Sequence, residues 1–276
     1  MDPVTQGALG AAAAQAILGP KLGRRTWLLG ALGGMAADLD VLIRSPTDPL
    51  MAIEFHRHFT HSLAFVPIGG LIVALPWLAR KKNRPDARLI VAATTIGYAT
   101  HGLLDAFTTY GTLLWWPFAR TRVAWNTIGI IDLTYTLPLL LGVWLAVRRD
   151  RRRPAVVALA LTSLYMALCG LQAWRAQSAA YRLADSRGHA PTRAEVMPTV
   201  LQNKTWRSIY EADGMVYADR IRVPWFGTPR VDDGEQAPAL RTETLDPKLL
   251  EDPKDRRTFE VLMWFSRGWL AQPPGD

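Results

Sequence analysis

Residues 155–174 read AVVALALTSLYMALCGLQAW and carry no charged side chain. A membrane-spanning helix needs about 20 mostly apolar residues, so this run predicts a span. Residues 63–79 and 129–147 have the same apolar character and predict two more. The mean hydropathy of the whole chain is nevertheless only +0.04, because a polar C-terminal part offsets these runs.

Three further segments of the N-terminal part are apolar but less clear. Residues 27–43 and 89–107 carry charged groups near one end, and residues 5–18 are short and rich in Ala and Gly. The short segment could span the membrane, tilt, or re-enter from one side. Small residues in these segments would allow close helix packing: Gly7, Gly10, Gly30, Gly33 and Gly34.

Beyond Trp174 the chain becomes polar, charged and rich in proline. The patterns predict a partly helical linker (175–195), strands (205–210, 215–217 and 221–226), a loop (228–256) and an amphipathic helix (259–270). The predicted fold is therefore an all-α polytopic membrane helix bundle of about six helices over residues 1–174. A small C-terminal α+β extracytoplasmic domain is expected over residues 175–276.

Lys and Arg are concentrated in alternate connections between the apolar segments. One set carries Lys21, Arg24, Arg25, Arg80, Lys81, Lys82, Arg84, Arg88, Arg148, Arg149, Arg151, Arg152 and Arg153. The other set carries Arg44, Arg57, Arg120 and Arg122. Cytoplasmic loops carry an excess of Lys and Arg, so we expect the first set inside a bacterial-type inner (plasma) membrane. Six spans then place both termini outside. This topology also accounts for the net charge of +8 without a nucleic-acid partner.

Most of the histidines lie in or beside the apolar segments: His56, His58, His61 and His101. The topology, derived without them, brings them to the outer face together with Asp38, Asp40, Asp105 and Asp132. His101 and Asp105 are four residues apart and share one helix face. Asp38 and Asp40 are two apart, so both can point to one site only if their helix ends or bends there.

These residue types indicate a metal site. Neutral imidazole and carboxylate together suit Zn, Mn or Fe, with zinc favoured here, and ionisable side chains at membrane depth are costly without a role. A single such residue near a helix end is more often a cap or a solvated group. We expect His58 to be a bystander and His189 to be solvated, whereas Asp132 is either a cap, an arginine partner or part of the site.

The chain resembles the YdjM-like family of membrane-bound proteins, which are regarded as metal-dependent hydrolases. The resemblance lies in ADLD at 37–40, HRHFTHS at 56–62 and HGLLDAFT at 101–108, followed by YG at 110–111, WPF at 116–118 and ID at 131–132. It covers residues 1–175 and implies a metal-site set of Asp38, Asp40, His56, His61, His101 and Asp105. The family usually has proline where this chain has Ala37, and often histidine where it has Gln6, a poorer ligand.

The expected function is a membrane-bound metal-dependent hydrolase that acts on a lipid or lipid-linked phosphoester at the outer face. A bound divalent metal lowers the pKa of water to about 7. Asp40 or Asp105 could act as general base, and Arg57 could neutralise an anionic substrate. Two alternatives stay open: a divalent metal or proton transporter that uses the same residues, and a non-catalytic membrane anchor for the C-terminal domain. A transporter would need polar side chains through to the cytoplasmic face, where Leu, Val, Ala and Ile dominate.

Overall fold

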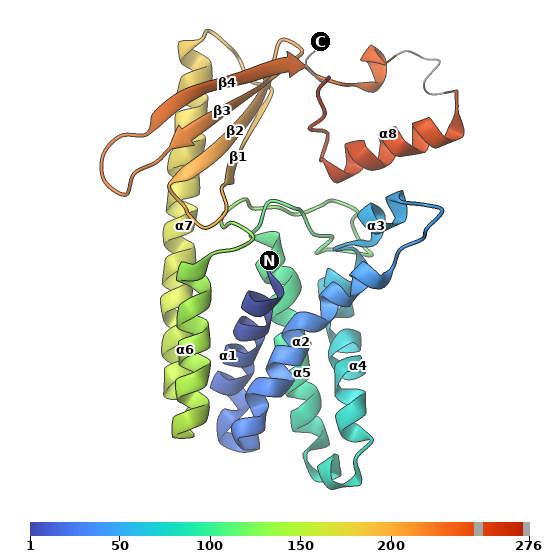
Figure 1. Ribbon diagram of the computed structural model, residues 1–276, viewed down its shortest axis with the longest axis vertical. Coiled ribbons are helices and arrows are strands. Elements are labelled where there is room, and N and C mark those ends of the chain that lie inside the picture. The colour runs from blue at the N-terminus through green and yellow to red at the C-terminus, as the bar shows by residue number, and fades with distance from the viewer. Residues whose placement is uncertain (246–250, 273–276) are drawn as a thin grey trace.

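The N-terminal part of the computed structural model is a bundle of helices (Figure 1). The structure describes residues 1–245 and 251–272. Its helices up to the sheet are α1 (Pro3–Leu22), α2 (Thr26–Ala36), α3 (Leu50–Phe55), α4 (Val66–Leu78), α5 (Ala87–Ala106), α6 (Leu133–Arg149) and α7 (Arg153–Ser186). Each of the six apolar segments predicted from the sequence is helical over most of its length, so the mostly helical character of this part is confirmed.

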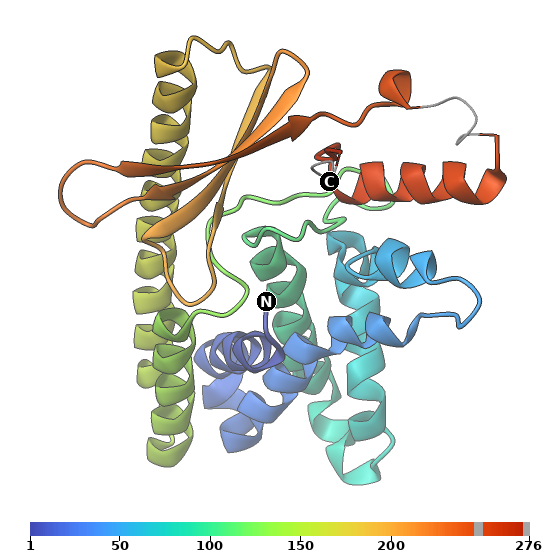
Figure 2. The same ribbon diagram turned by 45° about the horizontal axis from the view of Figure 1, so that its top comes forward.

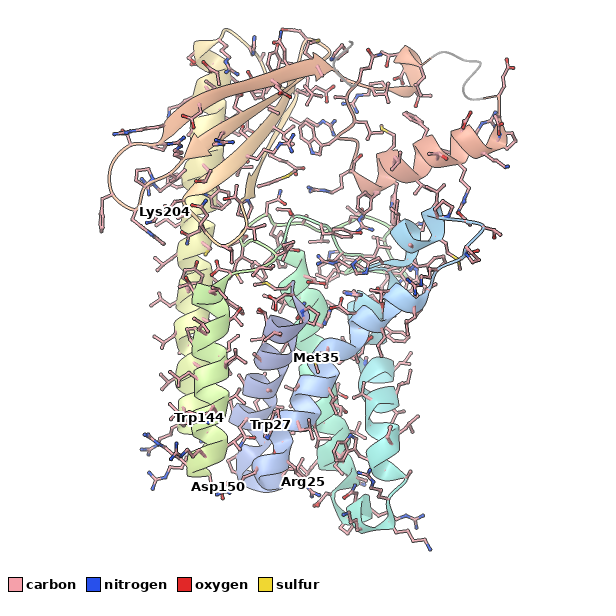
Figure 3. The ribbon with its side chains drawn as sticks, in the orientation of Figure 1. Arg25, Trp27, Met35, Trp144, Asp150 and Lys204 are labelled. Atoms are coloured by element: carbon pink, nitrogen blue, oxygen red, sulfur yellow. The ribbon has the colours of Figure 1, made fainter. Side chains whose placement is uncertain are left out.

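The basic connections gather at one end of this bundle. Figure 1 shows the α1–α2, α4–α5 and α6–α7 connections at the bottom of the view and the N-terminus at the opposite end. In Figure 3, Arg25 and Asp150 lie at the bottom, whereas Lys204 lies well above them. The alternation of basic and acidic-histidine connections along the sequence therefore corresponds to two opposite ends of the bundle.

Glycines let α1, α2 and α5 approach closely. A Cβ atom on Gly10 would lie 2.4 Å from the Gly30 carbonyl oxygen, and one on Gly33 would lie 2.2 Å from the Thr94 carbonyl oxygen. Real Cβ atoms essentially never come within 3.0 Å of another heavy atom, so these positions require glycine. This close packing holds the end of α2 against α5, and both helices contribute to the site described below.

The lengths and hydropathies of the helices support fewer membrane spans than the six apolar segments predicted from the sequence. Among the described residues, α7 alone is long and apolar enough to cross a membrane by itself. Residues Leu50–His61 and Leu63–Leu78 meet the same test as a pair, but the chain bends by 59° between them. The other helices of the bundle are shorter or more polar.

Helix α7 extends well past the predicted end of the bundle. Residues 175–195 are partly helical, as predicted, but the helix is the continuation of α7 to Ser186, and the segment ends in a strand that begins at Arg193. An alanine-rich stripe explains the extension, since buried Ala176, Ala179 and Ala180 pack against the sheet. Their small side chains let the sheet lie close to the helix.

The C-terminal part is an antiparallel sheet in the order β1-β2-β3-β4, followed by a helix. The elements are β1 (Arg193–Pro198), β2 (Thr205–Ala212), β3 (Met215–Arg222), β4 (Arg230–Pro238) and α8 (Pro253–Phe265). Trp206, Ile221 and Val223 are fully buried against α7 and form the core between helix and sheet. Figure 2 shows the sheet crossing the upper half of α7, with α8 on the other side of the molecule.

Three details of the predicted C-terminal part are corrected. Residues 221–226 do not form a strand of their own, because β3 already ends at Arg222. The loop expected over 228–256 contains β4, which alternation could not reveal because most of its side chains on both faces are exposed. The expected closing helix exists, but it lies earlier in the chain, from Pro253 to Phe265.

Candidate metal centre

Three chain segments that meet at the end of the bundle opposite the basic connections form the candidate site. Helix α2 ends at Ala36 and continues as a 3-10 turn, η2 (Ala37–Leu42), which carries Asp38 and Asp40. A second 3-10 turn, η3 (Phe59–His61), carries His61, and the last turns of α5 carry His101 and Asp105. The change of helix type at Ala37 supplies the bend that two aspartates two residues apart require.

Four side chains converge to form what we call the buried cluster: Asp38, His61, His101 and Asp105. The Nε2 atoms of His61 and His101 are 3.0 Å apart. Asp38 Oδ1 lies 3.5 Å and 3.3 Å from these two nitrogens, and Asp105 Oδ2 lies 3.3 Å and 3.5 Å from them. His61, His101 and Asp105 are almost completely buried, whereas the Asp38 side chain is 22% exposed.

These distances fit a tetrahedral metal ion. Zinc binds nitrogen and oxygen at about 2.0–2.2 Å, so neighbouring ligand atoms around a tetrahedral zinc lie about 3.3–3.5 Å apart. Four of the five distances above, 3.3 to 3.5 Å, match this spacing. The distance between the two Nε2 atoms, 3.0 Å, is slightly shorter. Buried Asp105 Oδ2 also accepts no hydrogen bond, although buried carboxylate oxygens are normally satisfied. Arg57 Nε lies 3.2 Å from this oxygen in an ion pair without hydrogen-bond geometry, and a divalent cation would give the oxygen a direct bond.

The outward-facing ring nitrogens of both histidines support the same conclusion. His101 Nδ1 lies 2.5 Å from the carbonyl oxygen of Gly34, which can only accept, so the Nδ1 of His101 carries the proton. His61 Nδ1 lies 3.2 Å from Asp40 Oδ2 and 3.0 Å from the Thr60 hydroxyl. Both Nε2 atoms then present lone pairs to the same point. Metal-binding histidines are usually oriented in this way by a carbonyl or carboxylate behind them.

A second set of ligand atoms, the outer cluster, shares Asp38 with the first: Asp38, Asp40 and His56. Asp40 Oδ1 lies 2.9 Å from His56 Nδ1, while Asp40 Oδ2 is occupied by the backbone N–H of Arg57 and the Thr60 hydroxyl. The His56 side chain is 24% exposed, so this cluster is more open than the buried one. Asp40 thus supports His61 of the buried cluster and could hold a second ion together with His56.

Asp105 is held by groups whose contact with it the sequence did not predict. The Gln6 amide donates to Asp105 Oδ1 at 2.9 Å, and the Met1 amino group contacts the same oxygen. Arg57 Nε lies 3.2 Å from Asp105 Oδ2, and the Arg57 guanidinium donates to the Thr108 hydroxyl at 2.8 Å. Gln6 is thus fully buried behind Asp105 and outside the four converging atoms.

The remaining candidate residues lie away from the buried cluster. Asp132 is the N-cap of α6 and accepts the Tyr165 hydroxyl at 2.8 Å, so the cap interpretation describes it. The ring of His58 packs against Trp116 instead of joining either cluster. His189 lies in the C-terminal domain, 2.9 Å from the Tyr210 hydroxyl. The sequence did not predict the contacts of Gly34 with His101 and of Thr60 with His61, because these contacts depend on how the segments pack.

Helix α8 lies over one side of the site. The indole of Trp264 donates to the Arg120 carbonyl at 3.0 Å, and Phe265 packs edge-on to Tyr110. The buried Arg122 guanidinium lies over the rings of Tyr110, Trp264 and Phe265, 4.9 to 5.5 Å from their centres. Such cation–π contacts are typically worth about 0.5–2 kcal/mol each. Tyr110 also packs against His56, so α8 is linked to the outer cluster through a single ring.

A cavity of about 620 Å³ lies beneath α8, next to α3. Its lining includes Glu54, His58, Arg120 and Arg257, so both signs of charge face it. Arg257 pairs across it with Asp48 and Glu54. Charged side chains therefore line this cavity together with the rings of Phe55 and Trp264.

The family model of the YdjM inner membrane protein matches residues 1–176. The chain belongs to this family. The match ends inside α7, two residues beyond Trp174, and it includes every residue of both clusters. The resemblance found in the sequence is thereby confirmed, whereas the sheet and α8 lie outside the matched region. Neither a curated protein nor a solved structure matches the chain.

Proposed function

We propose that the protein is a membrane-bound metal-dependent hydrolase that cleaves a phosphoester of a lipid or lipid-linked substrate. The observation that carries the proposal is the buried cluster, in which two imidazole nitrogens and two carboxylate oxygens converge at tetrahedral spacing. The shared Asp38 lets the outer cluster hold a second ion beside the first. Two metal ions about 3.5–4 Å apart are a common arrangement for phosphoester cleavage.

Residues around such ions have different roles in the proposed reaction. Zinc, when bound, acidifies water and polarises a phosphoryl oxygen. Asp40 orients His61 through Oδ2, while its Oδ1 faces the more open outer cluster. This oxygen can accept a proton from water when only the buried cluster holds an ion, and it would be a ligand when the outer cluster holds the second ion. Arg57 is buried beside Asp105 and places a positive charge where a phosphoester would need neutralising. Asp105, held by Gln6, acts mainly as a ligand in this arrangement.

The surface beside the site favours a lipid substrate. Leu39, Val41 and Leu42 follow directly on Asp38 and are 53–67% exposed, although each is a large apolar side chain. Exposed apolar groups of this kind mark a surface that contacts lipid or another protein. A phosphoester at the headgroup level of the membrane would reach Asp38 next to this surface.

The membrane topology is part of the same proposal. Helices α1, α2, α4, α5, α6 and α7 form a polytopic bundle with the basic connections inside and the C-terminal domain outside. The gathering of the basic connections at one end supports this orientation. Alkaline phosphatase fused after residue 202 should be active, and a cytoplasmic reporter at the same place inactive. The reverse pattern would overturn the orientation.

The activity is tested with purified protein in vesicles. We expect zinc-dependent cleavage of a phospholipid or lipid-linked phosphoester that is lost on chelation and in His101→Ala, and retained in His58→Ala, the matched histidine outside both clusters. Sealed proteoliposomes should take up no zinc. Uptake that depends on His101, without hydrolysis across a broad phosphoester panel, would favour a transporter. Full activity in His101→Ala would refute the proposed site.

A further inference from the structure

The lipid-facing surface of α7 has a clear upper limit. Its large apolar side chains are exposed at intervals from Val156 to Trp174. At 1.5 Å per residue this stripe is about 27 Å long, close to the roughly 30 Å hydrocarbon thickness of a bilayer. Arg175 follows immediately. The outer edge of the hydrocarbon therefore lies near Trp174, if α7 spans as proposed.

Arg175 fixes a turn of the C-terminal domain at this level. Its guanidinium donates to the carbonyl oxygens of Pro224 and Gly227 at 2.7 Å each. These residues bound the turn that connects β3 to β4, and Figure 1 shows this connection beside α7. Because Arg175 binds two carbonyls of this turn, the backbone of the turn lies within the length of one arginine side chain of the hydrocarbon edge.

The turn presents an aromatic side chain that no residue in the described part of the chain covers. Phe226 is 93% exposed although it lies between two residues of a turn that Arg175 holds in place. Val200 and Leu201, in the neighbouring β1–β2 connection, are also exposed, and the Leu201 N–H donates to the carbonyl of Ile131 at the start of α6. Exposed Lys204 lies at the same end of the sheet (Figure 3).

The opposite end of the sheet differs in composition. There the β2–β3 turn consists of Asp213 and Gly214, and the end of α7 carries Ser186 and Arg187. Exposed apolar groups thus lie at the end of the sheet that faces the bundle, beside the exposed basic side chains of Lys204, Arg222 and Arg230, and the opposite end has only polar groups in its turn. Apolar side chains among basic ones, at the level where the apolar stripe of α7 ends, fit the surface of an anionic bilayer.

We propose that the Pro224–Gly227 turn is a membrane-interface anchor, with Phe226 inserted at the boundary between lipid headgroups and acyl chains. Aromatic side chains prefer this depth, where an apolar ring meets a wet surface. Lys204 is placed to meet anionic headgroups. The anchor fixes the sheet on the membrane beside α7. It rests on the proposed membrane placement of α7 but not on the hydrolase activity.

Site-directed spin labelling tests the anchor on the full chain. Cys169 is the only cysteine and is buried, so Cys169→Ala gives a background without a thiol. A spin label is placed through Phe226→Cys, Leu164→Cys in the apolar stripe, or Ser186→Cys, which lies about 18 Å beyond Trp174 along the helix. Because Phe226 makes little contact with the protein, its replacement should leave folding intact.

The measured quantity is collision of each label with oxygen, which concentrates in lipid, and with a water-soluble nickel chelate. The protein is reconstituted in vesicles of phosphatidylethanolamine and phosphatidylglycerol. We expect the labels at 226 and 164 to lose most of the nickel accessibility seen at 186. Nickel accessibility at 226 equal to that at 186, with 164 protected, would overturn the anchor alone. A label at 164 as accessible as the one at 186 would overturn the placement of α7 as well.

Discussion

A substitution at Gly102 should disturb the buried cluster, because Gly102 follows the ligand His101 in α5 and packs against the backbone of the ligand His61. A Cβ atom at position 102 would lie 2.1 Å from the carbonyl oxygen of His61. Since real Cβ contacts essentially never fall below 3.0 Å, η3 and α5 must separate by about 0.9 Å in Gly102→Ala. Metal–ligand distances tolerate only about 0.2 Å, so this displacement is several times too large for an undistorted site.

The expected result for Gly102→Ala is a large loss of zinc affinity in a protein that still folds. Disturbing the groups that position metal ligands typically costs about 10–100-fold in affinity, and moving a ligand itself should reach the upper end of that range. Competition with a chromophoric chelator measures the affinity of purified protein. Circular dichroism checks that the helices are retained.

Gly170→Ala is the matched control. Gly170 lies within α7, and a Cβ atom there would meet nothing within 4 Å. Replacing a helical glycine by alanine favours the helix by about 1 kcal/mol when no contact opposes it. We therefore expect Gly170→Ala to bind zinc as wild type does and to unfold at an equal or higher temperature. If Gly102→Ala also bound zinc with wild-type affinity, the proposed contact between α5 and His61 would not control the site.

Three further outcomes are expected. Asp40→Asn should weaken zinc binding about 10–100-fold while leaving His61 in place, measured by the same chelator competition; a loss as complete as that in His61→Ala would instead make Asp40 an indispensable ligand. Trp264→Ala should speed amide hydrogen exchange in α8 without changing metal content, since the hydrogen bond from the indole to the Arg120 carbonyl fixes α8 to the rest of the protein. Unchanged exchange would show that the stability of α8 does not depend on this hydrogen bond. Burial raises the pKa of Glu211, but hydrogen bonds from Arg241 and Arg193 outweigh burial and leave it below its ordinary value. The stabilisation from Glu211 is therefore full above the ordinary pKa of about 4.3 and is lost as pH falls below it. The protection factors of β2 amides, which correct exchange rates for their intrinsic pH dependence, should then be lower than at neutral pH, and Glu211→Gln should reduce this change.

The sequence was enough to bring most of the site together. Alternating basic loops placed Asp38, His61, His101 and Asp105 at one end, because topology constrains residues far apart in the chain. The four-residue spacing of His101 and Asp105 gave their common face directly. The structure refines one role, since Asp40 lies behind His61 and beside His56 instead of among the four converging atoms.

The features that the sequence did not reveal depend on contacts between distant or featureless segments. The group that orients His101 is the backbone carbonyl of Gly34. Every residue has a backbone carbonyl, so only the packing of α2 on α5 determines which one meets His101. The contact of α8 with the site joins Trp264 to Arg120, which are 144 residues apart. Strand β4 was missed because an edge strand exposed on both faces has no buried periodicity.

The central claim is that the buried cluster holds a divalent metal ion, and elemental analysis of the purified, folded protein tests it most directly. The account predicts bound zinc, manganese or iron close to one or two equivalents per chain in wild type and in His58→Ala, and a sharp loss in His101→Ala. His101→Ala must first be shown to retain its helices, because removing one ligand leaves its neighbours unpaired. Equal metal content in wild type and folded His101→Ala, or no metal in either, would contradict it.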